Sequence, residues 1–369
     1  MKVIWNNFVE NGDIYKSVYK GRYCKGCESD KQDSDLVNGK CPDHPTTELE
    51  LVEEENYFFN LTKYKDTLLS WIDSNPTFLE PANKLEELKN LIIGSRDISI
   101  SRTKQNCPWG INVPNDDNQV IYCWFDAIWN YAFAAGYLTD NFKWDRVINI
   151  CGPDILRFHG VIFQSFLQAE GIKNSSKLLV HGTILDKDGV KISKSIGNVI
   201  DPIEQLQKYG VDAVRYYSLA GLNTYGNSSW NEDDLKALWN SQIVNDWGNL
   251  ISRVLHLIDI KLDGRIKTVG TQEFSNTISD YVKDITNLWD NFKVRDALLK
   301  TNELVKFGNK YINDVKPWSS ENYSYELTNL YLLLTTVNEF YIPLFGVEKY
   351  QEVEEIIKAG KKEILYSRI

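Results

Sequence analysis

From Asn231 to the end of the sequence, apolar residues recur at a helical spacing. Between Leu235 and Ile258 they stand every three or four positions, and a second such series begins at Ile285. Polar and charged residues fill the positions between them. A helix with one apolar face must bury that face against other helices. The spacing therefore predicts a helical bundle over residues 231–369.

Three short apolar runs in the middle of the chain have the composition of buried strands. They are "VIYCWF" (Val120–Phe125), "VINI" (Val147–Ile150) and "LLV" (Leu178–Val180). Two of the turns that follow open predicted helices, one from Pro153 to Gly171 and one from Asp126 to about Gly136. Alternating strands and helices predict a parallel, doubly wound sheet whose ligands bind beyond the carboxyl ends of the strands. Only about half of such a sheet is recognisable.

The N-terminal part has a different pattern, and composition sets the broad class of protein. Residues 1–20 predict an aromatic-rich helix or strand, residues 21–56 are turn-rich, and residues 57–95 have near-helical spacing. With 43% hydrophobic residues, no apolar run of membrane-span length and only six cysteines, the chain reads as a cytoplasmic protein of two or three domains. A net charge of −10 argues weakly against unspecific polyanion binding and leaves room for a local basic patch.

Cysteine and histidine occur in two close pairs near the N-terminus. Cys24 and Cys27 are separated by two residues, and after thirteen intervening residues Cys41 and His44 show the same gap. Two such pairs suit a tetrahedral zinc site, because each pair forms a knuckle and the two knuckles face each other. Coincidence among six cysteines is the alternative, but both pairs lie in turn-type sequence. We predict a structural Zn²⁺ in which these four side chains fill every position, so that the metal activates no water.

The segment "HGTILDKDGVKISKSIGNVIDP" (His181–Pro202) places two lysines on a glycine-flanked loop. "DKDG" favours a tight hairpin turn, and Asp201 favours a capped helix start with Glu204 completing a capping box. Lysines on a mobile loop near the end of a strand can neutralise a triphosphate during attack at its α-phosphate. A solvated lysine pair is the commoner outcome for such a composition, but the order of strand, turn, lysines and capped helix favours function.

Aromatic residues and a histidine recur in "YCWFDAIWNY" and "CGPDILRFHG". They can wall an apolar pocket at the top of the sheet, with Asp154 placed to reach a ribose hydroxyl. Taken alone, aromatic residues at helical spacing are more often core, and a lone histidine is more often a satisfied buried side chain. The candidate wall residues are Trp124, Ala127, Tyr131, Phe158 and His159.

A series of short stretches, all in one order along the chain, carries a family resemblance. They are "GDIYKSVYKGRYCKGCE", "CPDHP", "EENYFF", "SRDISISR", "WGINVPND", "WFDA", "CGPDILRFH", "LLVHG", "LDKDGVKISKS", "GNVIDP", "YGVDAVRYY", "NLISR" and "KPW". Together they make the chain similar to methionyl-tRNA synthetase, a class I aminoacyl-tRNA synthetase. "KISKS" alone fits any class I synthetase, whereas the cysteine-bearing stretches with "EENYFF" separate the methionyl from the isoleucyl, leucyl and valyl enzymes.

The resemblance implies a reaction and its partners. Such an enzyme joins L-methionine to ATP, with Mg²⁺, to give methionyl-adenylate and pyrophosphate, and then transfers methionine to tRNA(Met). The implied fold is a partial Rossmann-type parallel sheet, a zinc-knuckle connective domain and a C-terminal helical anticodon-binding bundle. A non-catalytic tRNA-binding remnant of such an enzyme is the alternative function. Among specificities, another class I enzyme for an aliphatic amino acid is the alternative.

The resemblance also implies roles for individual residues. "KISKS" has Ile192 where the family has methionine, and its Lys191 and Lys194 would act on the ATP phosphates, Lys194 most directly. Gly152 and Asp154 match the adenosine-contacting segment. The positions lining the methionine pocket correspond to Trp124, Ala127, Tyr131, Ile155, Phe158 and His159. Ile128 and Cys123 stand where relatives often have proline and valine.

In the bundle, Asn249 and Arg253 are four residues apart and so share one helix face. They match the anticodon-reading helix of the family, and Trp318 in "KPW" matches its base-stacking tryptophan. Unpaired bases are commonly read by polar contacts together with aromatic stacking. A core position is the alternative for Trp318, but its polar neighbours indicate an exposed loop.

One family signature, His-Ile-Gly-His, is absent from the sequence, which contains four histidines, His44, His159, His181 and His256. We therefore expect the first half of the nucleotide fold to be missing and the chain alone to form little adenylate. Three explanations stay open: a truncated gene product, a split enzyme that a separate N-terminal polypeptide completes, or a fragment. The expected domains are 1–20 (remnant of the first Rossmann half), 21–115 (zinc-knuckle connective domain with helices), 116–185 (second Rossmann half), 186–230 (KISKS loop and stem-contact region) and 231–369 (anticodon-binding helices).

Overall fold

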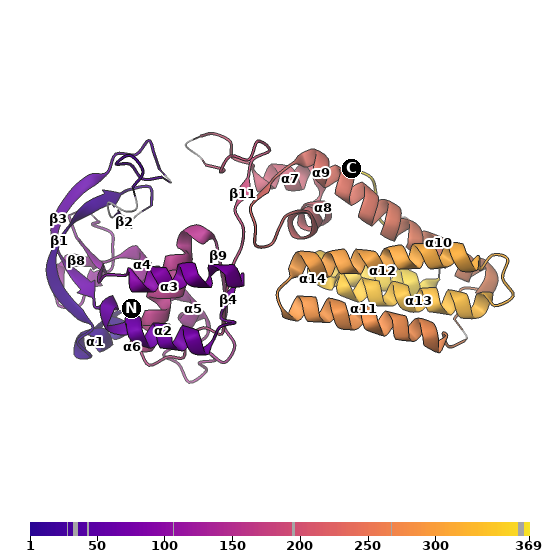
Figure 1. Ribbon diagram of the computed structural model, residues 1–369, viewed down its shortest axis with the longest axis horizontal. Coiled ribbons are helices and arrows are strands. Elements are labelled where there is room, and N and C mark those ends of the chain that lie inside the picture. Colours follow the sequence, from indigo (N-terminus) through magenta and orange to yellow (C-terminus); the bar gives the residue numbers. More distant parts are fainter. Residues whose placement is uncertain are drawn as a thin grey trace. The chain divides into compact units, whose positions relative to one another are not determined.

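The chain divides into two compact units, Met1–His181 and Gly182–Ile369, which Figure 1 shows in colours that follow the sequence. The computed structural model describes residues 1–27, 29–31, 36–42, 44–105, 107–193, 196–266, 268–360 and 365–369. Within these residues we find no helix whose length and apolar content would allow it to span a membrane.

The first unit begins with a helix and a long antiparallel sheet. Helix α1 (Lys2–Glu10) leads into β1 (Ile14–Cys24), which pairs with β3 (Glu50–Phe59) from Ile14 opposite Phe59 to Tyr23 opposite Glu50. The outer strands are β2 (Ser29–Lys31) beside β1 and β5 (Ile98–Ser99) beside β3. The helical spacing predicted from residue 57 is wrong up to Phe59, because pairing with a distant strand overrides the local pattern there.

The helices predicted between residues 57 and 95 begin after this strand. They are η2 (Leu61–Tyr64), α2 (Lys65–Ser74), η3 (Ala82–Lys84) and α3 (Leu85–Ile93). Leu68 and Ile72 on α2 and Leu88 and Ile92 on α3 are fully buried, as their spacing predicts.

The run Val120–Phe125 is not a strand of the parallel sheet, which corrects our prediction. The strand is β8 (Asp116–Ile121), and it lies antiparallel between β6 (Ser101–Thr103) and β7 (Asn112–Val113). The chain turns into a helix at Cys123, since "CWFDA" forms α4 (Cys123–Ala127), followed by α5 (Asn130–Ala134). Apolar composition alone cannot separate a buried strand from a buried short helix.

The predicted parallel sheet is present with three strands in the order β4 (Leu79–Glu80), β10 (Lys177–Val180) and β9 (Ile148–Cys151). After β9 the predicted helix runs as η4 (Pro153–Ile155), η5 (Phe158–Ile162, a π-helix) and α6 (Phe163–Ala169). The mixed α/β fold class is therefore confirmed.

One expectation for β9 is wrong. Ile150 is 65% exposed although its run has the composition of a fully buried strand. Strand β9 is an edge strand of the sheet, and its residues alternate, with Asn149 and Cys151 buried and Ile150 exposed. An edge strand that is covered on one side has this period of two.

The second unit opens with the lysine loop and continues almost entirely as helices, so the predicted bundle is confirmed. Strand β11 (Ile184–Leu185) pairs in parallel with β12 (Ser228–Ser229). The helices are α7 (Pro202–Tyr209), α8 (Val211–Tyr216), η6 (Tyr217–Gly221), α9 (Glu232–Leu238), η7 (Trp239–Gly248), α10 (Asn249–Leu262), α11 (Gln272–Asp290), α12 (Val294–Val315), α13 (Tyr323–Phe340) and α14 (Ile342–Ala359). Figure 1 shows α11, α12 and α13 running side by side.

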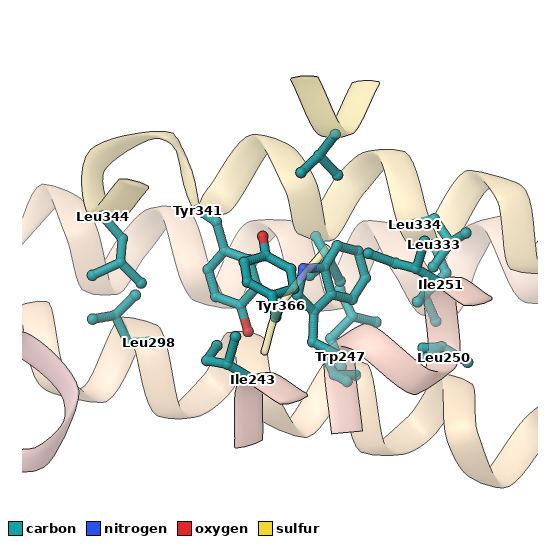
Figure 2. Close-up of a cluster of buried hydrophobic side chains, with 14 of the residues drawn as sticks. Ile243, Trp247, Leu250, Ile251, Leu298, Leu333, Leu334, Tyr341, Leu344 and Tyr366 are labelled. Carbon is teal, nitrogen blue, oxygen red and sulfur yellow. The ribbon is translucent and has the colours of Figure 1, made fainter. Parts of the chain in front are cut away.

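The core of the second unit combines aromatic packing with a buried polar network. In Figure 2 the Trp247 indole lies beside the rings of Tyr341 and Tyr366, and the Trp247 and Tyr341 rings meet edge to face at 5.8 Å. The Tyr341 hydroxyl donates to Asn302 Oδ1 (2.7 Å), and Asn302 Nδ2 donates to the Tyr216 hydroxyl (2.6 Å). This network ties α8 and α12 to the end of α13, and burial raises the pKa of both tyrosines well above its ordinary value.

Helices α7 and α9 are held together by one carboxylate. Glu232, in the first turn of α9, accepts hydrogen bonds from Lys208, Tyr209 and Gln205 of α7, the last at 2.8 Å from Nε2. The Lys208 ammonium, followed by the Tyr209 hydroxyl, lowers the pKa of Glu232 to about 2. Because the side chain is partly exposed, solvent reduces the energetic value of this contact.

We expect Glu232→Gln to lower the free energy of unfolding by about 1 kcal/mol at pH 7. A carboxylate whose pKa is depressed on folding stabilises the protein above its unfolded-state pKa and loses this effect as the pH falls through the folded-state value. The gap between wild type and variant, measured by urea unfolding, should therefore shrink below about pH 4.5 and vanish near pH 2. Asp234→Asn, in the same helical turn, is the matched control, and an equal loss in that variant would contradict the prediction.

Candidate functional site

The carboxyl ends of β9 and β10 bring together three residues of the first unit. Gly152 follows β9, and Pro153 starts the next helical turn, which carries Asp154. A Cβ atom placed on Gly152 would lie 2.6 Å from Asp154 Oδ1 and 3.7 Å from His181 Cε1. His181 follows β10, and its backbone N–H donates to the Cys151 carbonyl (3.0 Å). Side chains at the carboxyl end of a parallel sheet are well placed for ligand binding, and a larger residue at position 152 would displace the Asp154 carboxylate.

Two of the six predicted pocket residues form an aromatic pair at a cavity. The Trp124 indole from α4 and the Phe158 ring from η5 stack at 4.2 Å with an interplanar angle of 21°. Both line a cavity of about 300 Å³, which Arg96, Asp97 and Arg157 also border. The cavity thus has an apolar aromatic wall beside charged groups, the arrangement expected for a small amphiphilic ligand.

Tyr131 and His159 form a second pair, away from that cavity. The Tyr131 hydroxyl lies 2.9 Å from His159 Nε2, and His159 Nδ1 lies 3.1 Å from the Ile155 carbonyl oxygen. A carbonyl only accepts, so Nδ1 carries the proton and Nε2 accepts from the tyrosine. Burial lowers the pKa of His159 and raises the pKa of Tyr131, which favours the neutral form of each.

The other predicted pocket positions are placed differently. Ala127 is exposed on α4 and Ile155 is half-buried at the start of its helix, and neither lines the 300 Å³ cavity. Of the two departures from the family pattern, Ile128 is buried and Cys123 is exposed. The structure therefore divides the six candidates into a stacked pair, a hydrogen-bonded pair and two separate positions.

The predicted hairpin before the lysines is confirmed. The Asp186 N–H donates to the Val190 carbonyl (2.9 Å), and the Asp186 carboxylate accepts from the backbone N–H groups of Asp188 (3.0 Å) and Val190 (2.8 Å). Gly189 has a φ of 78°, which the turn requires and glycine adopts without strain. Lys191 then bridges back to Leu185, so the first lysine starts at the end of a fixed turn.

Asn198 holds the two sides of the lysine loop together. Its side-chain amide donates to Asp186 Oδ2 (2.8 Å) and to the Lys191 carbonyl (3.2 Å), and its Oδ1 accepts from the Ser193 N–H (2.9 Å). The Asn198 hydrogen bond, followed by the Val190 N–H, lowers the pKa of Asp186. The predicted residue Lys194 lies outside the described residues. Asp201 caps the start of α7, because its carboxylate accepts a hydrogen bond from the Ile203 N–H (2.8 Å).

The four predicted metal ligands lie together. The ligand atoms of Cys24, Cys27, Cys41 and His44 are all within 4.8 Å of one another. Cys27 Sγ lies 3.5 Å from Cys41 Sγ and 3.1 Å from His44 Nδ1. Ligand atoms around a tetrahedral zinc, about 2.0–2.3 Å from the metal, have separations of this size. The cluster has the number, type and spacing of ligands that a metal ion needs.

The backbone at Gly26 leaves room for the His44 ring to approach the cysteines. A Cβ atom at Gly26 would lie 2.4 Å from the His44 ring, so only glycine lets the histidine close on the first cysteine pair. In the absence of a cation, burial and the neighbouring Cys41 raise the pKa of Cys27 to about 12. A bound cation would reverse this preference, since metals bind thiolates.

The predicted anticodon-contacting residues all lie in the second unit. Asn249 and Arg253 occupy α10 and line one cavity of about 560 Å³ together with His256. Arg253 Nη2 donates to Asn313 Oδ1 (2.6 Å) at the end of α12, which fixes its guanidinium. Trp318 is 44% exposed in the loop after α12 and does not line that cavity.

Sequence reasoning assigned no role to several residues that position this site. His181 lies in the stretch "LLVHG". Asp97 lies in "SRDISISR", and its carboxylate accepts hydrogen bonds from the Tyr15 hydroxyl (2.7 Å) and the Thr62 N–H (3.0 Å). Asn198 and Asn313 were also missed. In the sequence, each of these two residues appears only as an asparagine near a loop or a helix end. Asparagine is too common at such positions to identify a functional site.

Comparisons with known proteins converge on one family. A family profile described as "tRNA synthetases class I (M)" matches residues 43–255. Curated relatives named methionine–tRNA ligase include those of Caldanaerobacter subterraneus (38% identical, 85% of this chain and 50% of the relative) and Thermotoga maritima (37%, 84% and 51%). The chain spans about half the length of the curated relatives it matches. Mycobacterium tuberculosis methionyl-tRNA synthetase in complex with methionyl-adenylate is similar in structure, with a TM-score of 0.87, 29% identity and coverage of 96% of this chain and 73% of that one.

The Tyr131–His159 pair predicts the titration of one histidine. His159 should titrate below its ordinary value of about 6.5, because burial favours the neutral ring. Tyr131→Phe should raise this pKa, since it removes the donor to Nε2. Proton NMR can follow the four histidines, and Tyr137→Phe, whose hydroxyl contacts Glu170 instead, is the matched control. An unchanged His159 pKa in Tyr131→Phe would contradict this assignment.

Proposed function

This chain belongs to the class I tRNA synthetase family (M), and we propose that it is part of a methionine–tRNA ligase. Such an enzyme activates L-methionine with ATP and Mg²⁺ and transfers it to tRNA(Met) during translation. The family match carries the proposal, because it covers residues 43–255, more than half of the chain, and reaches the helix with Asn249 and Arg253. The curated relatives named methionine–tRNA ligase support the same specificity.

We assign the activation step to residues at the carboxyl ends of the strands and on the lysine loop. The methionine carboxylate attacks the α-phosphorus of ATP, and pyrophosphate leaves with the electrons of the broken P–O bond. Gly152 and Asp154 hold the adenosine, with Asp154 accepting from a ribose hydroxyl. Lys191 and Lys194 neutralise the charge that develops on the phosphates. The Asp186–Asn198 contact positions Lys191 for this role.

The methionine side chain is assigned to the aromatic region between α4 and η5. A thioether is flexible and polarisable and packs well against the rings of Trp124 and Phe158. Ala127, Tyr131, Ile155 and His159 are the remaining positions that the family resemblance assigns to this pocket. A neutral imidazole suits this role, because a charged one would disfavour the apolar thioether.

The cysteine–histidine cluster is proposed to hold a structural Zn²⁺. Cys24, Cys27, Cys41 and His44 fit the metal by number, ligand type and mutual distance. With all four positions occupied by protein, the ion supplies a cross-link and no Lewis-acid chemistry at a substrate. Its function is to hold together a turn-rich module that has little apolar core of its own.

We propose the domain organisation that the family resemblance implies. Residues 21–115 are the connective domain with zinc, 116–185 the second Rossmann half, 186–230 the lysine loop with its support, and 231–369 the anticodon-binding helices. Residues 1–20 are assigned to the first Rossmann half. Asn249, Arg253 and Trp318 read the anticodon, and a cytoplasmic location follows from the role in translation.

Methionine-dependent ATP–pyrophosphate exchange tests the activation step. The chain is assayed alone and together with a separate polypeptide that carries the His-Ile-Gly-His region. We expect little exchange from the chain alone, and in the mixture we expect exchange with methionine and not with leucine. Lys194→Ala should lower the rate in the mixture about 100-fold, as removal of a transition-state donor does. Lys187→Ala is the matched control, because this exposed lysine pairs with its neighbour Asp188.

Two outcomes bear on the alternative function. Exchange that is absent in every mixture, while the chain still binds tRNA with a CAU anticodon, would establish a non-catalytic tRNA-binding protein instead. Exchange with another aliphatic amino acid at the same rate would refute the methionine assignment.

Zinc removal should unfold the cysteine module without unfolding the second unit. A structural zinc contributes its binding free energy to folding, so a chelator should abolish protection from proteolysis around residues 24–44 and leave the helices of residues 231–369 intact. Gly26→Ala should lower the metal content per chain, measured by atomic emission, because its Cβ would meet the His44 ring. Cys123→Ser, which changes an exposed cysteine outside the cluster, is the control and should keep the full metal content. Full metal content in Gly26→Ala would contradict the assignment.

A further inference from the structure

A closed turn presents Trp318 at the end of α12. The helix ends at Val315, and Lys316 adopts a left-handed conformation with a φ of 49°. The Lys316 carbonyl then accepts from the backbone N–H groups of Ser319 (2.9 Å) and Ser320 (3.2 Å). Trp318 stands inside this turn and is 44% exposed. Its backbone is therefore enclosed by hydrogen bonds although its ring is open to solvent.

A single hydroxyl ties the far side of this turn to the next helix. Ser320 Oγ donates to Glu326 Oε1 (2.8 Å) and accepts from the Asn322 N–H (3.0 Å). Glu326 lies in the first turn of α13, and its own N–H donates to the Asn322 carbonyl (3.2 Å). The Ser320–Glu326 contact thus links the turn that carries Trp318 to a helix buried in the bundle core.

The Glu326 carboxylate is committed to this contact. Its second oxygen, Oε2, is shielded from solvent and has no hydrogen-bond partner among the described residues. Neither oxygen takes part in an ion pair within the part of the chain that the structure describes. An acidic residue near a helix N-terminus interacts favourably with the helix dipole, but that effect alone requires no contact with Ser320.

We propose that Ser320 and Glu326 are positioning residues that hold Trp318 ready to stack on an unpaired base. The proposal rests on the proposed function, in which Trp318 contacts the anticodon. A tryptophan on a free loop would lose conformational entropy on binding, whereas one held in place before binding loses less. The Ser320–Glu326 contact supplies this preorganisation without touching the RNA.

Binding of a fluorescent CAU anticodon stem-loop to the full chain tests the proposal by anisotropy. Trp318→Ala should weaken binding about ten-fold, within the range known for base–aromatic stacking. Ser320→Ala and Glu326→Ala should each weaken it about three-fold by releasing the turn. In the Trp318→Ala background neither change should weaken binding further, because a positioning residue has no effect when its target is absent.

Two conservative variants and one control distinguish the effect of the Ser320–Glu326 hydrogen bond on binding from the effect of negative charge. Ser320→Thr and Glu326→Gln keep donor and acceptor and should bind like wild type. Glu321→Ala removes a carboxylate from the same loop that is exposed and makes no such contact, so it should not weaken binding. The dependence of Kd on salt should be unchanged in Ser320→Ala, since no phosphate contact is lost.

The outcomes distinguish this proposal from the function on which it rests. Unchanged binding in Trp318→Ala would refute the stacking role of the tryptophan and with it the proposed anticodon contact. A ten-fold loss in Trp318→Ala with no loss in Ser320→Ala and Glu326→Ala would refute the positioning role alone. A double variant that is weaker than Trp318→Ala by the full single-variant factor would also refute it.

Discussion

The parallel pairing of β9 with β10 is the constraint on which the candidate catalytic region depends. Lys177–Val180 aligns with Ile148–Cys151, so both strands end at the same level. Gly152 and His181 follow directly and meet there, and the Cys151 carbonyl accepts from the His181 N–H. Pro153 then starts a helix at once, since its fixed φ suits a first helical turn. That helix carries Phe158 and His159 to their partners on α4 and α5.

The second unit contains the lysine loop near its start and Asn249 and Arg253 on α10. Helix α12, which has 22 residues and a length of about 33 Å, connects them. In its first turn Arg295 Nε donates to the Ala220 carbonyl (3.3 Å), beside the loop that supports β11. In its last turn Asn313 accepts from Arg253 (2.6 Å). The buried Asn302 network holds the middle of this helix to α8, so the helix is fixed along its length.

The sequence predicted best those features that depend on short-range chemistry. The spacing of Cys24, Cys27, Cys41 and His44 predicted a cluster, and "DKDG" predicted the turn that Asp186 closes. The helices of residues 231–369 followed from their period, because each apolar face lies within one continuous segment. The π-helical turn that contains His159 has no such signature, since its extra residue per turn is set by packing.

Long-range pairing explains what the sequence did not predict. Strand β1 pairs with β3 across the cysteine module, and β8 pairs with β6, which lies across a turn-rich segment. Local composition cannot specify such partners, so Val120–Phe125 was assigned to the wrong sheet. Ile150 is exposed because its side chain lies on the face of the sheet opposite to that of the buried Asn149 and Cys151. The roles of Asn198 and Asn313 became visible only when the structure brought each amide to its partner.

We propose that the two units contribute to one reaction, the joining of methionine to a tRNA with a CAU anticodon. Transfer of radiolabelled methionine to two transcripts that differ only in the anticodon tests it most directly, with the His-Ile-Gly-His region supplied in trans. We expect label on the CAU transcript and little label on the other. Equal labelling of both transcripts, or labelling with leucine in place of methionine, would contradict it.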